Sequence, residues 1–277
     1  GGFTLIELSI VLVIIGLIVG GVLVGQDLIK AAEIRATVGQ VEKYNAAINT
    51  FRTKYNGLPG DIVSAQATAF GLFGTGMTGA SGLGDGNGQL QSSGDTFRAA
   101  GEPLVFWLHL SQAGLVDGSY GANAASGGVP ATANLMSEYL PTAKLGRGNY
   151  WSAAADAGQN YYILGGVTGL ATTGAYTFST ALTPIESFNI DVKLDDGAPV
   201  TGVVQARGTG ASIFANYTST GAATGGVAPT FSDNATSSCV TGNDGGAPAS
   251  ATVTSNVYNR ATTAGNTPNC TLRFRFN

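Results

Sequence analysis

The hydrophobic pattern predicts one long helix over residues 1–56, with two unlike halves. Residues 8–26 form a run of 19 residues without a charge, mostly Ile, Val, Leu and Gly. As a helix this run spans roughly 29 Å, close to the hydrocarbon thickness of a bilayer. Over residues 27–56 charges return, and apolar residues recur every three or four positions from Ile34 to Tyr55. The pattern therefore predicts a hydrophobic half at 3–26 and an amphipathic half at 27–56 that packs on a globular domain.

The remaining residues, 57–277, are expected to form a globular head. The Asn-Gly-Leu-Pro-Gly sequence at 56–60 ends the long helix, and the Gly-rich residues 57–95 predict a loop. Residues 104–113 are apolar nearly all round and are bounded by Pro103 and Gly114, which predicts a buried helix in which His109 is structural. A short helix is predicted over 133–139. Strand-like runs lie at 161–167, 175–180, 187–194, 200–207, 252–258 and 271–276.

The order of these elements predicts an α+β fold, with a long helix packed on an antiparallel sheet. The runs at 187–194 and 200–207 flank an Asp-Asp-Gly-Ala-Pro sequence, which predicts a β-hairpin. In the last run, Leu272, Phe274 and Phe276 alternate with arginines, as in a half-buried strand.

Composition narrows the function classes. Charged residues make up 11% of the chain, the net charge is −4, and no run of Lys or Arg occurs, so a basic nucleic-acid-binding surface is not expected. One His and two Cys are too few for a His/Cys zinc site. No nucleophile elbow, phosphate loop or HExxH motif occurs, and we therefore expect no enzyme. From Gly208 on, only five residues are charged, a composition common outside the cell.

The N-terminus resembles a known family. Residues 2–8 read Gly-Phe-Thr-Leu-Ile-Glu-Leu and are followed by Ser-Ile-Val-Leu-Val-Ile-Ile-Gly. This string strongly resembles the class III signal junction of type IV pilins and type II secretion pseudopilins. The resemblance covers about 25 residues by motif and extends to about residue 56 through the amphipathic helix. It implies the pilin "lollipop" fold, in agreement with the α+β pattern.

The resemblance also implies how the N-terminus is processed and used. Prepilin peptidase would cut between Gly2 and Phe3, and the new terminal amine of Phe3 would be N-methylated. Glu7 would neutralise the terminal amine of a neighbouring copy during assembly. One departure is that Gly1 precedes Gly2, so either both glycines are an uncleaved remnant or the junction is processed upstream.

Two features of the apolar half suit a polymer better than an isolated anchor. Glu7 places a carboxylate where burial without a partner costs several kcal/mol. Gly16, Gly20, Gly21 and Gly25 each weaken a helix by about 1 kcal/mol relative to Ala. In a bundle of such helices, Glu7 finds a positive partner and the glycines allow close packing or local unwinding. Simple helix pairing in a membrane is the alternative use of small residues.

Cys239 and Cys270 are the only cysteines. In a chain exported across a membrane they are expected to form one disulfide, with two free thiols as the alternative. The bridge would close a segment poor in core candidates and stabilise it by roughly 3–4 kcal/mol. Many type IV pilins have a similar C-terminal disulfide-bounded loop exposed on the filament.

A glycine-rich segment is similar to the start of a calcium loop. Asp85, Asn87 and the carbonyl of Gln89 have the alternate spacing of oxygen ligands, and Asp95 or Glu102 would complete the site only through the fold. The alternative is a flexible glycine turn without metal. Asp191, Asp195 and Asp196 are attributed to turn chemistry, and three N-glycosylation patterns, at Asn216, Asn234 and Asn269, are given little weight.

The expected function is that of a structural subunit, a major type IV pilin. Before assembly it would lie in the inner membrane, where it would contact the prepilin peptidase and the pilus assembly platform. It would then polymerise with copies of itself into an extracellular filament for adhesion, motility or DNA uptake. The alternatives are a type II secretion pseudopilin, a tip-located minor pilin that acts as an adhesin, and a simple membrane-anchored binding protein.

Overall fold

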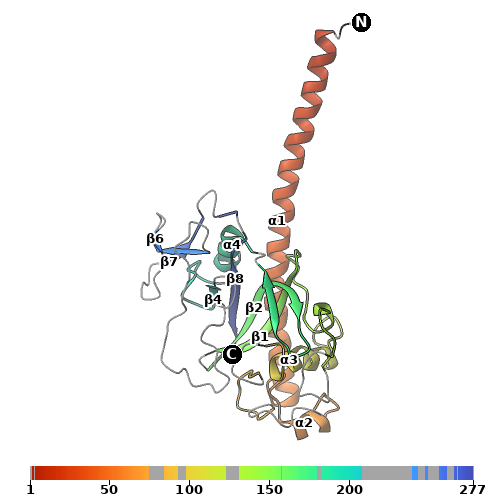
Figure 1. Cartoon of the computed structure of the whole chain (residues 1–277), viewed down its shortest axis with the longest axis vertical. Helices are drawn as coiled ribbons and strands as arrows, with labels where there is room; N and C mark the ends of the chain where they lie inside the picture. Colours follow the sequence, from red (N-terminus) through yellow and green to blue (C-terminus); the bar gives the residue numbers. More distant parts are fainter. Residues whose placement is uncertain are drawn as a thin grey trace.

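Figure 1 shows the structure, a computed structural model of the chain, as a globular head from which one long helix projects. The helix carries the N-terminus at its free end, and the C-terminus lies in the head. The described residues are 2, 4–74, 84–92, 98–122, 131–156, 158–179, 182–207, 239–242, 247–248, 256–260, 265–266 and 268–276.

The predicted long helix is confirmed as α1, Leu5–Tyr55, a single helix of 51 residues. It begins with a capping box, in which the side chains of Thr4 and Glu7 bond to each other's backbone N–H. It ends at Asn56, which adopts the left-handed conformation (φ 52°) and donates its N–H to the carbonyl of Arg52. The predicted end at residues 56–60 is therefore correct.

The second half of α1 supplies one wall of the core. Its apolar residues lie three or four positions apart, so they share one face, and that face packs on the head. The ring of Tyr44 meets Trp107 and Trp151 edge-on, with centroids 5.0 and 5.7 Å apart. The buried residues of α1 are Ile34, Thr37, Val41, Tyr44, Ala47, Ile48, Phe51 and Tyr55.

The main sheet of the head is antiparallel, with strand order β1-β2-β8-β4 and with β3 paired to β2. A second, smaller sheet has the order β6-β5-β7. The strands are β1 (Asn149–Asp156), β2 (Gln159–Leu170), β3 (Tyr176–Ser179), β4 (Val204–Arg207), β5 (Val240–Gly242), β6 (Ala247–Pro248), β7 (Asn256–Tyr258) and β8 (Thr271–Phe276).

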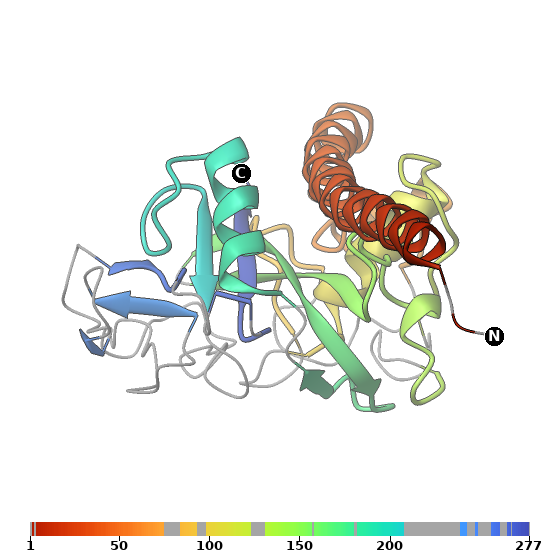
Figure 2. The ribbon, with the colours of Figure 1, turned by 90° about the horizontal axis from the view of Figure 1, so that it is seen from above.

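Helices α1 and α4 (Pro184–Leu194) lie over the same face of the main sheet and contact each other (Figure 2). Helix α3 (Glu102–Gln112) contacts both α1 and β1. Its residues from Glu102 to Leu110 are all buried, which confirms the predicted buried helix. The long helix on an antiparallel sheet is consistent with the predicted α+β fold.

Several sequence-based predictions were wrong. Residues 187–194 belong to α4, so the predicted hairpin with 200–207 does not form. The helix is favoured by a capping box between Thr183 and Glu186 and by Pro184 in its first turn, where the missing N–H costs nothing. The predicted loop contains α2 (Ser64–Ala69), and the predicted helix at 133–139 is only a 3₁₀ turn, Met136–Glu138.

The strand predictions were correct for 271–276 and for the cores of β2, β3 and β4, whereas β1, β5 and β6 were not predicted. Only the end of the run at 252–258 is described, as β7.

Candidate functional site

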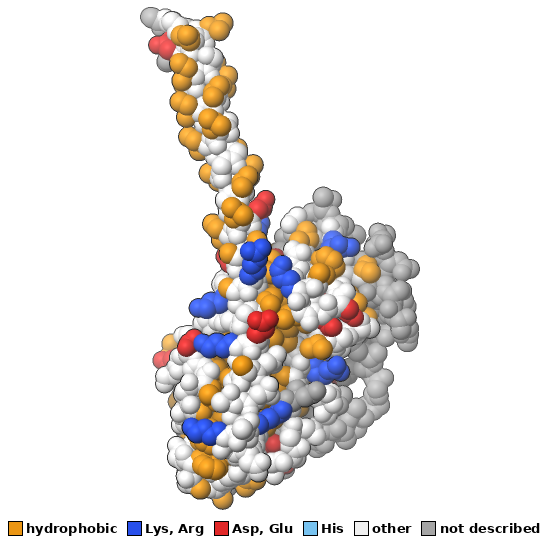
Figure 3. Space-filling view, turned by 180° about the vertical axis from the view of Figure 1, so that it is seen from behind, with side chains coloured by type: hydrophobic (Ala, Val, Ile, Leu, Met, Phe, Trp, Pro, Cys, Tyr) orange, Lys and Arg blue, Asp and Glu red, His pale blue; other side chains and the backbone are white. Residues whose placement is uncertain are grey.

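The first half of α1 is an apolar surface that no described residue of the head covers. The large apolar side chains of residues 5–29 are each between 51% and 89% exposed, on every side of the helix. Figure 3 shows this half standing clear of the head. The helix is long and apolar enough to cross a membrane, so the chain has a segment that could anchor it there. The same surface could equally be buried among like helices.

Glu7 lies in the first turn of this surface and is held by Thr4. Its Oε2 accepts hydrogen bonds from the Thr4 N–H (2.8 Å) and the Thr4 hydroxyl (2.7 Å). Within the part of the chain that the structure describes, no basic side chain contacts Glu7. Phe3 lies outside the described residues, and Gly2 has open space around its Cα. The Thr-x-x-Glu capping box was not recognised from the sequence, although that spacing is its signal.

Gln40 adds polar contacts to the junction between α1 and the head. Its Oε1 accepts hydrogen bonds from the backbone N–H of Lys144 (2.7 Å) and from Nε1 of Trp151 (3.2 Å). Its Nε2 donates to the carbonyl of Thr142 (3.1 Å). One side chain therefore ties the helix both to the loop before β1 and to β1 itself.

The predicted calcium ligands Asp85, Asn87 and Gln89 form a compact turn. Oδ1 of Asp85 accepts the N–H of Asn87 (3.0 Å), and Oδ1 of Asn87 accepts the N–H of Gln89 (2.8 Å). These are the bonds of successive Asx turns, which form without any metal. The bonds are thus compatible with the glycine-turn alternative.

The fold also brings two distant carboxylates to this turn. Asp61 accepts the N–H groups of Gly86 (3.0 Å) and Gly88 (2.7 Å), and Glu102 accepts the N–H of Gln91 (2.7 Å). One oxygen each from Asp61, Asp85 and Glu102 lies within 4.8 Å of the others, so these residues could hold a hard cation.

Burial raises the pKa of two of these groups, Asp61 and Glu102. It raises the pKa of Glu102 to about 9 and that of Asp61 to about 6, while the backbone N–H groups that each carboxyl group accepts act in the opposite direction. Asp61 also lines a pocket of about 420 Å³ between the end of α1 and the turn. Glu102 was considered from the sequence as a residue that the fold might bring in, but Asp61 was missed because nothing in its local sequence indicates this tertiary contact.

His109 is a structural residue in the core. Its Nδ1 accepts the N–H of Gly60 (3.0 Å), and its Nε2 lies 2.7 Å from the carbonyl of Phe73. These two partners together require the neutral ring with the proton on Nε2. Burial lowers the pKa of His109 to about 4, which agrees with a neutral ring.

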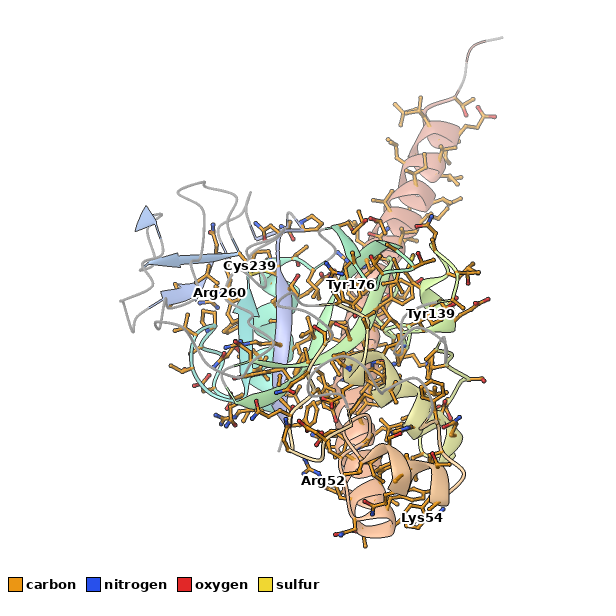
Figure 4. All side chains as sticks on the ribbon, turned by 60° about the horizontal axis from the view of Figure 1, so that its bottom comes forward. Arg52, Lys54, Tyr139, Tyr176, Cys239 and Arg260 are labelled. Atoms are coloured by element: carbon orange, nitrogen blue, oxygen red, sulfur yellow. A yellow bond between two sulfur atoms is a disulfide. The ribbon has the colours of Figure 1, made fainter. Side chains whose placement is uncertain are left out.

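The two cysteines are joined as predicted. A disulfide links Cys239 to Cys270, with the Cα atoms 5.0 Å apart. Cys239 directly precedes β5, on the side of β8 away from α1 (Figure 4). Beside this region, the Tyr258 hydroxyl of β7 donates to Asp191 of α4 (2.8 Å). Asn269 is 8% exposed and so is poorly accessible to glycosylation, and Asn216 and Asn234 lie outside the described residues.

The chain was compared with protein-family models, with curated proteins and with solved structures, and none of the three comparisons found a match. The resemblance of the N-terminus to the type IV pilins therefore remains a prediction from the sequence.

Proposed function

We propose that the chain is the repeating structural subunit of a type IV pilus, a major pilin that polymerises through the first half of α1. The observation that carries this proposal is a single helix whose first half is apolar and exposed on every side, and whose second half is packed on a folded head. The resemblance of residues 2–16 to the prepilin junction supports the choice of this family.

The physical argument rests on what a free subunit leaves exposed. The apolar surface of residues 5–29 must be removed from water, and a membrane or a bundle of like helices can do so. A lone anchor has no use for Glu7, whose carboxylate costs free energy in hydrocarbon unless a positive group pairs with it. A neighbouring copy supplies that group as its terminal amine.

Polymerisation in this form produces a filament with a defined polarity. Each copy offers Glu7 to one neighbour and its own N-terminus to another, so the contact is heterologous and does not close. The heads, on the opposite side of α1 from the bundle, form the outer surface. Strands β6 and β7, on the side of the head away from α1 (Figure 1), would then face outward for adhesion, motility or DNA uptake.

The runner-up is a type II secretion pseudopilin, because major pseudopilins bind calcium and Asp61, Asp85 and Glu102 come together. A calcium-dependent rise in the melting temperature of the full chain, absent in the Asp85→Asn variant, would favour the pseudopilin. No rise on titration from a chelated state would remove it. A minor pilin at the tip is distinguished by abundance, because sheared surface filaments would then consist mainly of another chain.

The deciding experiment replaces Glu7 with Ala in the full chain, produced in cells that make the filament. We expect filaments to disappear from the cell surface while the chain accumulates in the membrane with its disulfide formed. Glu138→Ala, which removes an exposed carboxylate of the head, is the matched control and should assemble normally. Normal filaments from Glu7→Ala would contradict the proposal.

A further inference from the structure

The second half of α1 has a face that nothing in the described chain covers. The helix packs on the head through the side that contains Tyr44, Ile48 and Phe51. The opposite side, half a turn away around the helix, is exposed to solvent over several turns. Its residues are Ala32, Arg35, Gly39, Glu42 and Ala46.

Small residues repeat along this face. Ala32, Gly39 and Ala46 follow one another at intervals of seven residues, so they lie nearly in line along the helix. A Cβ added at Gly39 would meet nothing within 4 Å, so the fold of the chain itself does not require glycine there. Glycine weakens a helix relative to alanine, and small residues allow a second helix to approach closely.

Two opposite charges lie in the same face. Arg35 and Glu42 are both exposed and seven residues apart, which places them about 10 Å apart along the helix axis. Neither forms an ion pair within the described residues. A helix bundle that buried this face would remove both charges from water, and a buried charge without a partner strongly destabilises an assembly.

We propose that this face is a contact between neighbouring copies of the chain, and that Arg35 of one copy pairs with Glu42 of the next. The inference rests on the proposed function, because the first half of α1 brings the copies together. Two parallel copies that are offset by seven residues, about 10 Å, place the guanidinium beside the carboxylate.

The charges would then set the register of the contact. The glycine midway between them allows the close approach, and an offset of zero would place Arg35 beside Arg35 and Glu42 beside Glu42. Charged pairs specify alignment between helices in this way, because wrong registers oppose like charges. Every copy carries both charges, so the same pairing repeats from copy to copy without closing.

The test reverses the charges in the full chain and measures the amount of sheared surface filament. Arg35→Glu and Glu42→Arg should each lower the amount by about tenfold or more, because each opposes like charges in the contact. The double variant Arg35→Glu/Glu42→Arg should return it to within about twofold of the unmodified chain, because the pair is restored with its signs exchanged. Lys193→Glu and Glu138→Arg, which reverse exposed charges of the head, are the controls.

Co-production of the two single variants separates pairing between copies from repair within one copy. Arg35→Glu offers two carboxylates and Glu42→Arg offers two guanidinium groups, so only alternating copies can pair. Filaments that contain both variants, from cells in which neither alone assembles, would support the inference. Disulfide formation in each variant checks that the head has folded.

Each negative result has a distinct meaning. If the single reversals assemble normally, or if neither the double variant nor the mixture recovers, the pairing of Arg35 with Glu42 is wrong. If Glu7→Ala stops assembly in the same cells, the proposed function stands and only this register contact is removed. If Glu7→Ala assembles normally, the proposed function itself fails.

Discussion

The two halves of α1 share one continuous backbone and have opposite relations to the rest of the chain. The second half buries one face against the head, and Phe51 within it is fully buried. The first half buries nothing, and even Ile14 in its middle is 51% exposed. Both halves are helical, although the first contains four glycines, so the two halves differ in burial and not in secondary structure. The first half therefore leaves an apolar surface that no described part of the chain covers.

The largest expected difference between the halves is in core packing. Phe51→Ala should lower the free energy of unfolding of the head by about 3–5 kcal/mol, because it leaves a cavity in the core. Ile14→Ala removes a side chain that touches no described part of the head and should leave the unfolding of the head unchanged. Fluorescence of Trp107 and Trp151 during urea unfolding of the full chain in detergent micelles reports both. Equal losses in the two variants would show that the halves are not energetically separate.

A second test lowers the pH and measures how the stability contributed by His109 changes. His109 contacts α1 near its C-terminal end. The ring of His109 stacks on Phe51, with centroids 6.0 Å apart, and accepts the N–H of Gly60. Burial lowers its pKa to about 4, below the value of about 6.5 in the unfolded chain. A group with a depressed pKa stabilises the fold fully above its unfolded pKa, and the contribution is lost as pH falls from about 6.5 towards 4. The loss amounts to at most about 3 kcal/mol.

This pH effect is measured as a difference between two chains. Glu102 acts in the opposite direction, because its raised pKa favours the folded state in acid. We therefore compare the unmodified chain with His109→Gln at pH 7 and pH 4. The stability advantage of the unmodified chain should shrink towards pH 4. An advantage that is constant with pH would show that His109 titrates alike in the folded and unfolded states.

The sequence predicted most where one periodicity continues over many residues. Both halves of α1 were recognised because the apolar run and the subsequent stripe are long, and β8 because its alternation is regular. Helix α4 was misread because Phe188, Ile190, Val192 and Leu194 alternate as in a strand. In the fold, α4 instead buries polar residues such as Ser187 and Asp191 beside Ile190. The pattern of hydrophobic positions therefore could not indicate which face of α4 is buried.

Only part of the candidate site was predicted from the sequence. The pairing of the cysteines follows from the cysteine count, whereas the role of Glu7 stays a prediction from the family resemblance. The approach of Asp61 and Glu102 to Asp85 depends on how the turn after α1 and the start of α3 pack against residues 84–92, and no local pattern encodes that contact. The same is true of Gln40, whose polar side chain on an amphipathic helix predicts only a solvated position.

The smallest expected effect concerns the junction itself and uses two glutamines of α1. Gln40→Ala removes the acceptor of Trp151 Nε1 and of the Lys144 N–H, and should lower the free energy of unfolding by about 1–2 kcal/mol. Gln26→Ala, the same change in the exposed part of α1, should have no effect on the head. Amide hydrogen exchange should show faster exchange around Lys144 in Gln40→Ala alone. If Gln26→Ala produced the same change, the division of α1 would not lie between residues 26 and 40.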